Sequence, residues 1–128
     1  MKLLIDTHVL LWWLRDNPKL GTRTRAAISQ SRANLMVSIA SFWELSIKVR
    51  NGKIDEFGSM LLNEVEAQGL HVLAVSAAHL AELENLPRIP GHGDPFDHLI
   101  LAQTKAEKAV LVTADRALDN YGIPTLRF

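Results

Sequence analysis

The chain has 128 residues, with 14 basic and 14 acidic side chains and no cysteine. This length corresponds to one domain, residues 1–128, which is long enough to bury a core without disulfides. The absence of cysteine excludes a disulfide framework, a thiolate metal site and a cysteine nucleophile. A hydrophobic content of 48% excludes a disordered chain.

No stretch of the sequence approaches the roughly 20 apolar residues that a membrane span requires. Asp6 interrupts the apolar run at the start of the chain, and no small-residue cleavage site follows it, which argues against a signal peptide. We therefore expect a cytoplasmic protein with no membrane partner.

Short apolar runs alternate with helical patterns along the chain. A strand at residues 3–5 is followed by helices at 7–15 and 22–31, a strand at 34–38, and helices at 40–50 and 55–68. Next come a strand at 70–75, a helix at 76–85, a loop at 88–93, a helix at 94–108, a strand at 109–113, a short helix at 115–120 and a strand at 124–128. This alternation predicts an α/β fold, a three-layer α/β/α sandwich around a mainly parallel sheet of about five strands.

Acidic residues follow or precede these strands at the carboxyl edge of the predicted sheet, where open parallel sheets bind ligands. Asp6 ends the first strand, and Asp115 follows the fourth. Asp94 and Asp97 open the helix that precedes the fourth strand, and Glu44 lies one turn into the helix after the second. Each acid also has a purely structural interpretation, because the aspartates can cap helices and Glu44 can pair with a lysine one turn on.

Crowded carboxylates repel one another, so these acids together predict a stabilising cation. Glu44 strengthens this interpretation, since its helix is apolar on most sides and an uncompensated carboxylate there would be costly. The histidines show no spacing typical of a metal site, and ligation by oxygen alone favours Mg²⁺ or Mn²⁺. We interpret His8 and His98 as exposed or structural histidines, with substrate contact as the alternative for each.

Four stretches of the sequence carry the acids and their surroundings. They are LIDTHVLLW at residues 4–12, SIASFWELS at 38–46, GDPFDHLILAQ at 93–103 and LVTAD at 111–115. These stretches resemble those of PIN-domain ribonucleases, and specifically of VapC-type toxins from bacterial toxin–antitoxin pairs. They occur in the order and at the spacing of that family, and the resemblance covers essentially the whole chain.

The resemblance implies a Mg²⁺- or Mn²⁺-dependent endoribonuclease that acts on RNA. The acidic quartet of the family falls on Asp6, Glu44, Asp97 and Asp115, and its hydroxyl on Thr113. A further acid of less uniform role falls on Asp94, and His98 departs from the arginine that many relatives carry, which puts the substrate contacts there in doubt. The family also implies a homodimer and a cognate antitoxin protein that blocks the site.

Within this site we expect Asp6, Asp97 and Asp115 to bind the metal directly, with Asp94 as a further candidate ligand. Glu44 is expected to bind through water or to accept a proton, and Thr113 to orient a ligand or a water molecule. A metal-activated water would attack the phosphodiester in line. The resemblance implies products with 5′-phosphate and 3′-hydroxyl ends.

Two further groups of residues are candidates for contacts with macromolecules. Basic residues are concentrated in the first half of the chain, as solvated helix faces or as an RNA-binding surface formed by Arg23, Arg25, Arg32, Lys48, Arg50 and Lys53. Clustered aromatic residues fit either a core or a groove for a partner protein, namely Trp12, Trp13, Phe42 and Trp43.

The alternative from a different class is a receiver-type or other Mg²⁺-binding signalling module without nuclease activity. A receiver requires an acidic pair after the first strand, but Thr7 and His8 follow Asp6, and no strand supplies the required Asp and Lys. A phosphatase with an aspartate nucleophile would require an acid where His8 stands. A binding module with inactive acids remains open, and labelling with acetyl phosphate would identify a receiver.

Overall fold

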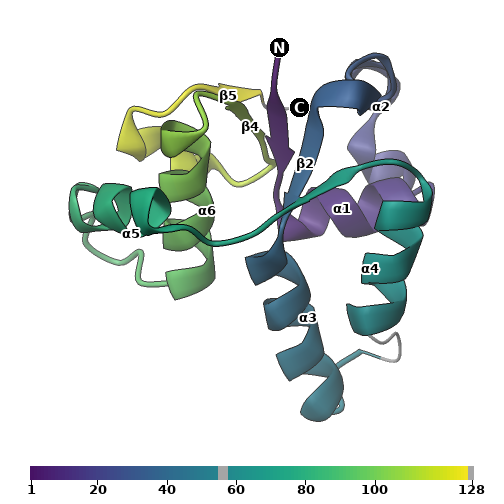
Figure 1. Ribbon diagram of the computed structural model, residues 1–128, viewed down its shortest axis with the longest axis horizontal. Helices are drawn as coiled ribbons and strands as arrows, with labels where there is room; N and C mark the ends of the chain where they lie inside the picture. The colour runs from purple at the N-terminus through teal and green to yellow at the C-terminus, as the bar shows by residue number, and fades with distance from the viewer. Residues whose placement is uncertain (55–57, 127–128) are drawn as a thin grey trace.

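The computed structural model describes residues 1–54 and 58–126, which form a sheet covered by helices on both faces (Figure 1). The strands are β1 (Leu3–Ile5), β2 (Leu35–Ser38), β3 (His71–Leu73), β4 (Val110–Val112) and β5 (Thr125–Leu126). The α-helices are α1 (Thr7–Leu14), α2 (Thr22–Gln30), α3 (Ile39–Arg50), α4 (Gly58–Ala67), α5 (Ala77–Glu84) and α6 (Pro95–Ala106). Three 3₁₀ segments connect them, η1 (Pro18–Leu20), η2 (Arg32–Asn34) and η3 (Arg116–Tyr121).

The predicted elements are confirmed in type and order, and their ends shift by a few residues. The short helix predicted at 115–120 is a 3₁₀ helix, and η1 and η2 are single turns that the sequence pattern does not predict. The predicted helix at 55–68 and the predicted strand at 124–128 include residues 55–57 and 127–128, which lie outside the described residues. None of the described helices combines the length and apolar character needed to cross a membrane.

The five strands form one sheet in the order β3-β2-β1-β4-β5, and every neighbouring pair is parallel. Parallel neighbours need crossover connections, and the helices between the strands supply them. In Figure 1, α1, α2 and α4 lie on one side of the sheet and α5 and α6 on the other. The predicted α/β/α sandwich around a parallel sheet of five strands is therefore confirmed.

Alternate side chains of the strands enter different cores, because successive residues of a strand face opposite sides of the sheet. Leu3 and Ile5 of β1 pack in the cluster that α1 and α4 cover. Leu4, between them, packs with Leu111 of β4 in the cluster that α6 covers. Each of these four side chains is fully buried. The uninterrupted apolar runs of the sequence therefore correspond to strands that are buried on both faces.

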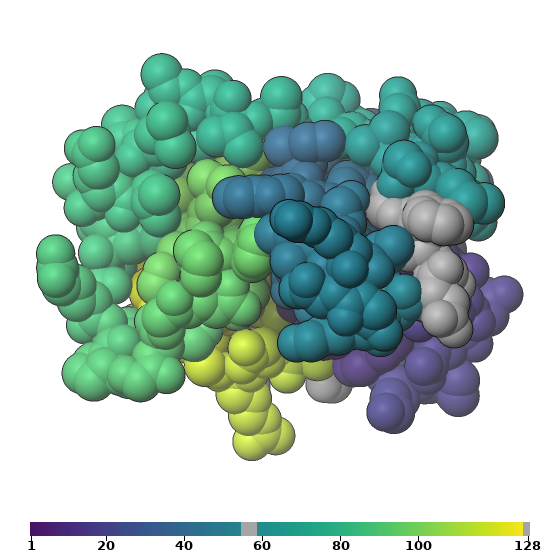
Figure 2. Space-filling view, turned by 90° about the horizontal axis from the view of Figure 1, so that it is seen from below, coloured from purple at the N-terminus to yellow at the C-terminus, as the bar shows by residue number. Residues whose placement is uncertain are grey.

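The carboxyl ends of the strands lead into the helices that surround the site. Asp6 follows β1 directly, and its backbone N–H donates to the carbonyl of Val112 at the end of β4, at 3.1 Å. Since Ile5 is paired with Val112 in the sheet, the residues after these two strands are neighbours. Figure 2 views the molecule from this side and shows α3, α6 and the segment after β4 around the edge.

A buried polar network lies just beneath this edge and joins β2 to α5 and α6. The Ser38 hydroxyl is hydrogen-bonded to Gln103 Oε1 at 2.5 Å and accepts the backbone N–H of Ala40 at 3.0 Å, which caps α3. The side-chain amide of Gln103 lies 3.3 Å from His79 Nδ1, and His79 Nε2 lies 2.8 Å from a carboxylate oxygen of Glu107. The network satisfies polar groups that would be costly to bury alone.

We expect Ser38→Ala to lower the free energy of unfolding by about 1–3 kcal/mol, because it removes a helix cap and leaves a buried amide oxygen without its donor. Urea denaturation measures this loss. The matched control is Ser46→Ala on the exposed side of α3, which should change stability by less than about 0.5 kcal/mol. Equal stabilities of the two variants would contradict a structural role for the network.

Candidate active site

Asp6 is the most deeply buried acid of the site, with 6% of its surface exposed. Its Oδ1 accepts the backbone N–H of Val9 at 2.9 Å and caps α1, so the structural interpretation of this residue is correct. Its Oδ2 accepts the hydroxyl of Thr113 at 2.5 Å. Thr113 Oγ1 in turn accepts the backbone N–H of Asp115 at 3.0 Å. Thr113 therefore connects the two acids across the ends of β1 and β4.

Two further acids also cap helices. Asp94 Oδ1 accepts the backbone N–H of Phe96 at the start of α6, at 2.9 Å. Asp115 Oδ1 accepts the backbone N–H of Ala117 at the start of η3, also at 2.9 Å. Each cap uses one oxygen of the carboxylate, so capping and cation binding through the second oxygen are compatible. The two interpretations of these acids are not exclusive.

The acids of the site make ionisation harder for one another. Burial raises the pKa of Asp6, and the charge of Asp115 contributes in the same direction. Burial is also the largest cause that raises the pKa of Asp97, to about 6, and the charge of Asp94 is the second. The charges of Asp115 and Asp6 raise the Asp97 pKa further, whereas His92 lowers it. Carboxylates that crowd together in this way, with Asp6 buried, Asp97 partly buried and Asp115 exposed, favour a bound cation.

Ligand atoms of His92, Asp97 and Asp115 all lie within 4.8 Å of one another. Two atoms that share one cation with ligand bonds of about 2.0–2.2 Å lie at most about 4.4 Å apart, so a small movement of these side chains would let them bind one ion together. Among the described residues, these three form the group of potential metal ligands whose atoms lie this close together. Asp6 and Glu44 do not belong to this group. Asp6 is nevertheless close enough for its charge to act on Asp97.

His92 is a site residue that the sequence reasoning missed. Its Nε2 lies 3.4 Å from Asp97 Oδ2, and its Nδ1 lies 2.6 Å from the hydroxyl of Tyr121. A partner on the second ring nitrogen is how proteins orient metal-binding histidines. The available signal was its position in a glycine-flanked loop five residues before Asp97, rather than a spacing between histidines. The candidate donor set in the structure thus adds an imidazole to the oxygen ligands that the sequence predicts.

Glu44 lies on the α1 side of the site. Its Oε1 accepts the hydroxyl of Thr7 at 2.9 Å, and its Oε2 pairs with Lys48 Nζ at 3.4 Å. The ion pair with Lys48 confirms the structural alternative for this residue. Thr7 immediately follows Asp6, so Glu44 contacts the turn that carries Asp6.

A cavity of about 260 Å³ opens beside the acids and is lined by Asp6, Asp115, His8, Trp12 and Ala114. The rings of His8 and Trp12 lie 6.4 Å apart at its side. The cavity therefore joins two acids to flat side chains, and flat side chains can stack on the unpaired bases of a nucleic acid.

Most of the predicted basic residues lie away from these acids. Arg25 is paired with Asp16 at 2.9 Å, and Arg32 lies over the ring of Trp13 at 5.6 Å. Arg32 comes just before β2, at the amino edge of the sheet, opposite to the acids. Arg23 lies with Arg25 on α2, and Arg50 and Lys53 lie at and beyond the far end of α3 (Figure 1). Of the six residues, Lys48 is the one with a direct contact to a predicted site acid.

The aromatic residues divide between the core and the surface. Trp13 and Phe42 are 7% and 4% exposed and belong to the core between the sheet and α1. For these two residues the core interpretation holds, and the prediction of a partner surface is wrong. Trp12 is half-buried and lines the cavity beside Asp6. Trp43 is 60% exposed and packs edge-on against Phe96, with ring centres 4.9 Å apart.

The comparisons with known proteins agree with this fold. The family model described as "PIN domain" matches residues 3–124. Ribonuclease VapC22 of Mycobacterium tuberculosis is 28% identical over 127 residues, which cover 94% of this chain and 92% of the relative.

Among solved structures, VapBC2 from Rickettsia felis, bound to a DNA fragment from its promoter, contains a chain with a TM-score of 0.75 at 18% identity. DNA-bound VapBC from Salmonella typhimurium contains one with a TM-score of 0.74, also at 18% identity. Each alignment covers 99% of this chain and 98% of the other. At these identities the two structures establish the fold, whereas the family model spans nearly the whole sequence. The chain therefore belongs to the PIN domain family.

Proposed function

We propose that this protein is a metal-dependent endoribonuclease and the toxin of a toxin–antitoxin pair. The observation that carries the proposal is the convergence of Asp6, Asp97 and Asp115 at the carboxyl edge of the sheet, with the pKa of Asp97 raised to about 6 by burial and by neighbouring charges. The name of the mycobacterial relative, Ribonuclease VapC22, supports RNA as the substrate.

Asp97, Asp115 and the imidazole of His92 would hold a Mg²⁺ or Mn²⁺ ion, with Asp6 and Asp94 as further ligands. When bound, the ion would supply charge to the phosphate and lower the pKa of the attacking water. Thr113 keeps the Asp6 carboxylate oriented by donating to its Oδ2, while Tyr121 orients the ring of His92 through Nδ1. The protein thus supplies a pre-arranged set of donors, and arrangement before substrate binding is a major source of catalytic power.

Glu44 is proposed to accept a proton or to bind the ion through water, from the α1 side of the cavity. The ion pair with Lys48 compensates the negative charge of the half-buried Glu44 side chain. The hydroxyl of Thr7 holds one of its oxygens in place. Attack on the phosphodiester would then release 5′-phosphate and 3′-hydroxyl ends.

We further propose an antitoxin protein and a second copy of the chain as partners, with action in the cytoplasm. The two solved structures compared above are VapBC complexes. Ile39, Trp43 and Ile47 lie one turn apart along α3 and are 36%, 60% and 37% exposed. An exposed apolar row of this kind is typical of a protein interface.

The test is to incubate the purified protein with a mixed RNA pool, with chelator or with added Mn²⁺ or Mg²⁺, and to sequence the cut ends. We expect no cleavage in chelator and recovery with either metal, because carboxylates dominate the donor set. Undiminished cleavage after exhaustive chelation would contradict the metal mechanism. Labelling by acetyl phosphate without RNA cleavage would instead support the signalling alternative.

A further inference from the structure

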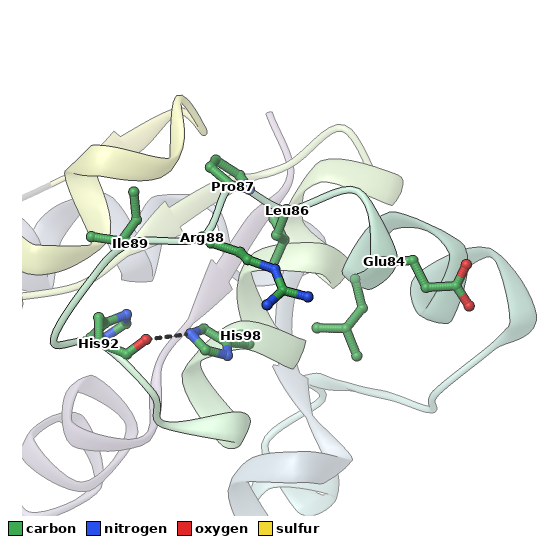
Figure 3. Close-up of a pocket in the computed structure, with 8 residues that line it drawn as sticks. Glu84, Leu86, Pro87, Arg88, Ile89, His92 and His98 are labelled. Carbon is green, nitrogen blue, oxygen red and sulfur yellow. Dashed lines mark hydrogen bonds between the residues drawn. The ribbon is translucent and has the colours of Figure 1, made fainter.

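A second cavity, of about 390 Å³, lies between the end of α5, the loop at residues 85–93 and the start of α6. We name it the loop pocket. Leu86, Arg88 and Ile89 of the loop form one side, and His92 and His98 form the side towards the acids. Its volume is within the range of about 300–1,000 Å³ that binding sites for small molecules occupy. Figure 3 shows the Arg88 guanidinium pointing into this space, with His98 on one side and Glu84 on the other.

The loop pocket and the candidate active site share a wall. His92 lines the pocket, and its Nε2 lies 3.4 Å from Asp97 Oδ2. A chain whose phosphate lies at Asp97 and Asp115 would therefore bring an adjacent group to the pocket.

The wall is held in shape before any ligand arrives. His98 Nε2 donates to the backbone carbonyl of His92 at 3.0 Å, which ties the loop to α6 (Figure 3). The backbone N–H of His92 donates to the carbonyl of Ile89 at 3.2 Å, which closes the turn. Leu86 and Ile89 pack against the core on the α6 side of the sheet. A site built in this way loses little entropy when it binds a ligand.

The chemistry of the walls matches a nucleobase. The rings of His92 and His98, at 73° to each other with centres 5.4 Å apart, and the side chains of Leu86 and Ile89 provide flat and apolar surfaces. Unpaired bases of RNA stack on such surfaces and are read through hydrogen bonds along their edges. Arg88 supplies the donors for such an edge, since it is exposed and forms no ion pair with any carboxylate of residues 1–54 or 58–126.

We propose that the loop pocket binds the base of the nucleotide next to the scissile phosphate, and that Arg88 selects guanine there. The assignment rests on the proposed ribonuclease function and names one specificity-determining residue for it. An arginine fork pairs with the O6 and N7 acceptors of guanine, whereas a side-chain amide pairs with the N6 and N7 of adenine. The identity of the residue at position 88 therefore sets which base is preferred.

The experiment compares the wild type with Arg88→Gln on a randomised RNA pool in Mn²⁺, by sequencing the cut ends. We expect the wild type to favour guanine at one position beside the cut. Arg88→Gln should reduce that preference about tenfold and shift it towards adenine, because the amide replaces the arginine fork. The control is Lys19→Gln, which removes one exposed charge on η1 and should leave the base preference unchanged.

Three results would overturn the assignment. Equal loss at all sequences, with a salt dependence reduced by about one charge, would mean that Arg88 contacts only phosphate. An unchanged cutting profile with an altered oligomeric state, measured by light scattering, would make the loop pocket a contact between proteins. A profile unchanged in both respects would mean that the pocket is not used. The absence of any cleavage by the wild type would instead overturn the proposed function itself, and the assignment with it.

Discussion

Replacing Asp6 by Asn should reduce RNA cleavage by roughly a thousandfold, while the protein stays folded. Asn caps a helix about as well as Asp, so the bond to the Val9 N–H persists and α1 is retained. The variant loses a negative charge that would help to hold the divalent ion beside the phosphate. Such an ion stabilises the transition state by several kcal/mol. Since each 1.36 kcal/mol corresponds to a tenfold change in rate, a loss of this size is expected.

Thermal unfolding provides a readout that does not depend on activity. Without metal, the Tm of Asp6→Asn should equal or exceed that of the wild type, because repulsion from Asp115 and the burial of a charge are relieved. Added Mg²⁺ should raise the Tm of the wild type more than that of the variant, because binding to the native state alone stabilises it. Expression in a bacterial host should arrest growth for the wild type only.

The matched control for Asp6→Asn is Asp16→Asn. Asp16 has 89% of its side chain exposed and has a positive φ of 51°, a conformation that Asn tolerates well. The control removes the same charge and should alter cleavage less than about twofold. Full activity and toxicity of Asp6→Asn would show that Asp6 is only a helix cap, and the nuclease proposal would then fail.

The second large effect concerns the stability of the metal-free protein, which should rise as the pH falls through about 6. The pKa of Asp97 is about 6 in the folded protein, against an ordinary value of 3.8 that applies to the unfolded chain. Burial and the charge of Asp94 disfavour its ionisation in the folded state. The folded state therefore binds this proton more tightly than the unfolded state, and stability is gained between about pH 7 and pH 4. Since a pKa unit corresponds to about 1.4 kcal/mol, the contribution is about 1–3 kcal/mol.

Asp97→Asn should remove most of this pH dependence and raise the metal-free Tm near neutral pH by several degrees. A divalent ion should have a related effect on the wild type, because it replaces the proton as the stabilising positive charge. The measurement is Tm against pH in chelator and in Mg²⁺ for the wild type, Asp97→Asn and the Asp16→Asn control. The raised pKa would be contradicted if the Tm of the wild type in chelator fell steadily on acidification and Asp16→Asn and Asp97→Asn showed the same fall.

The sequence by itself determined the order of the elements and the class of the fold. Short apolar runs between helical patterns, such as the one that ends at Ile5, favour strands that are covered on both faces. Because the carboxyl ends of parallel strands meet at one edge, the same pattern placed Asp6 and Asp115 on a common edge. The four stretches that resemble PIN-domain proteins then pointed to the family that the match over residues 3–124 shows.

The contacts within the site depend on packing, and sequence spacing does not encode them. The pairing of Ile5 with Val112 brings the hydroxyl of Thr113 onto Asp6, although 107 positions separate the two residues. His92 reaches Asp97 because its loop folds back over the start of α6.

Burial likewise became known only from the tertiary structure. Trp12 and Trp13 are adjacent in the sequence, but successive residues of a helix point about 100° apart. Trp13 therefore enters the core, and Trp12 lines the cavity beside Asp6. The position of Arg32 was also known only from the tertiary structure. A residue that precedes a parallel strand lies at the amino edge of the sheet, whereas the acids that follow the strands lie at the carboxyl edge. Arg32 is for this reason distant from the acids, and charge counted along the chain could not reveal it.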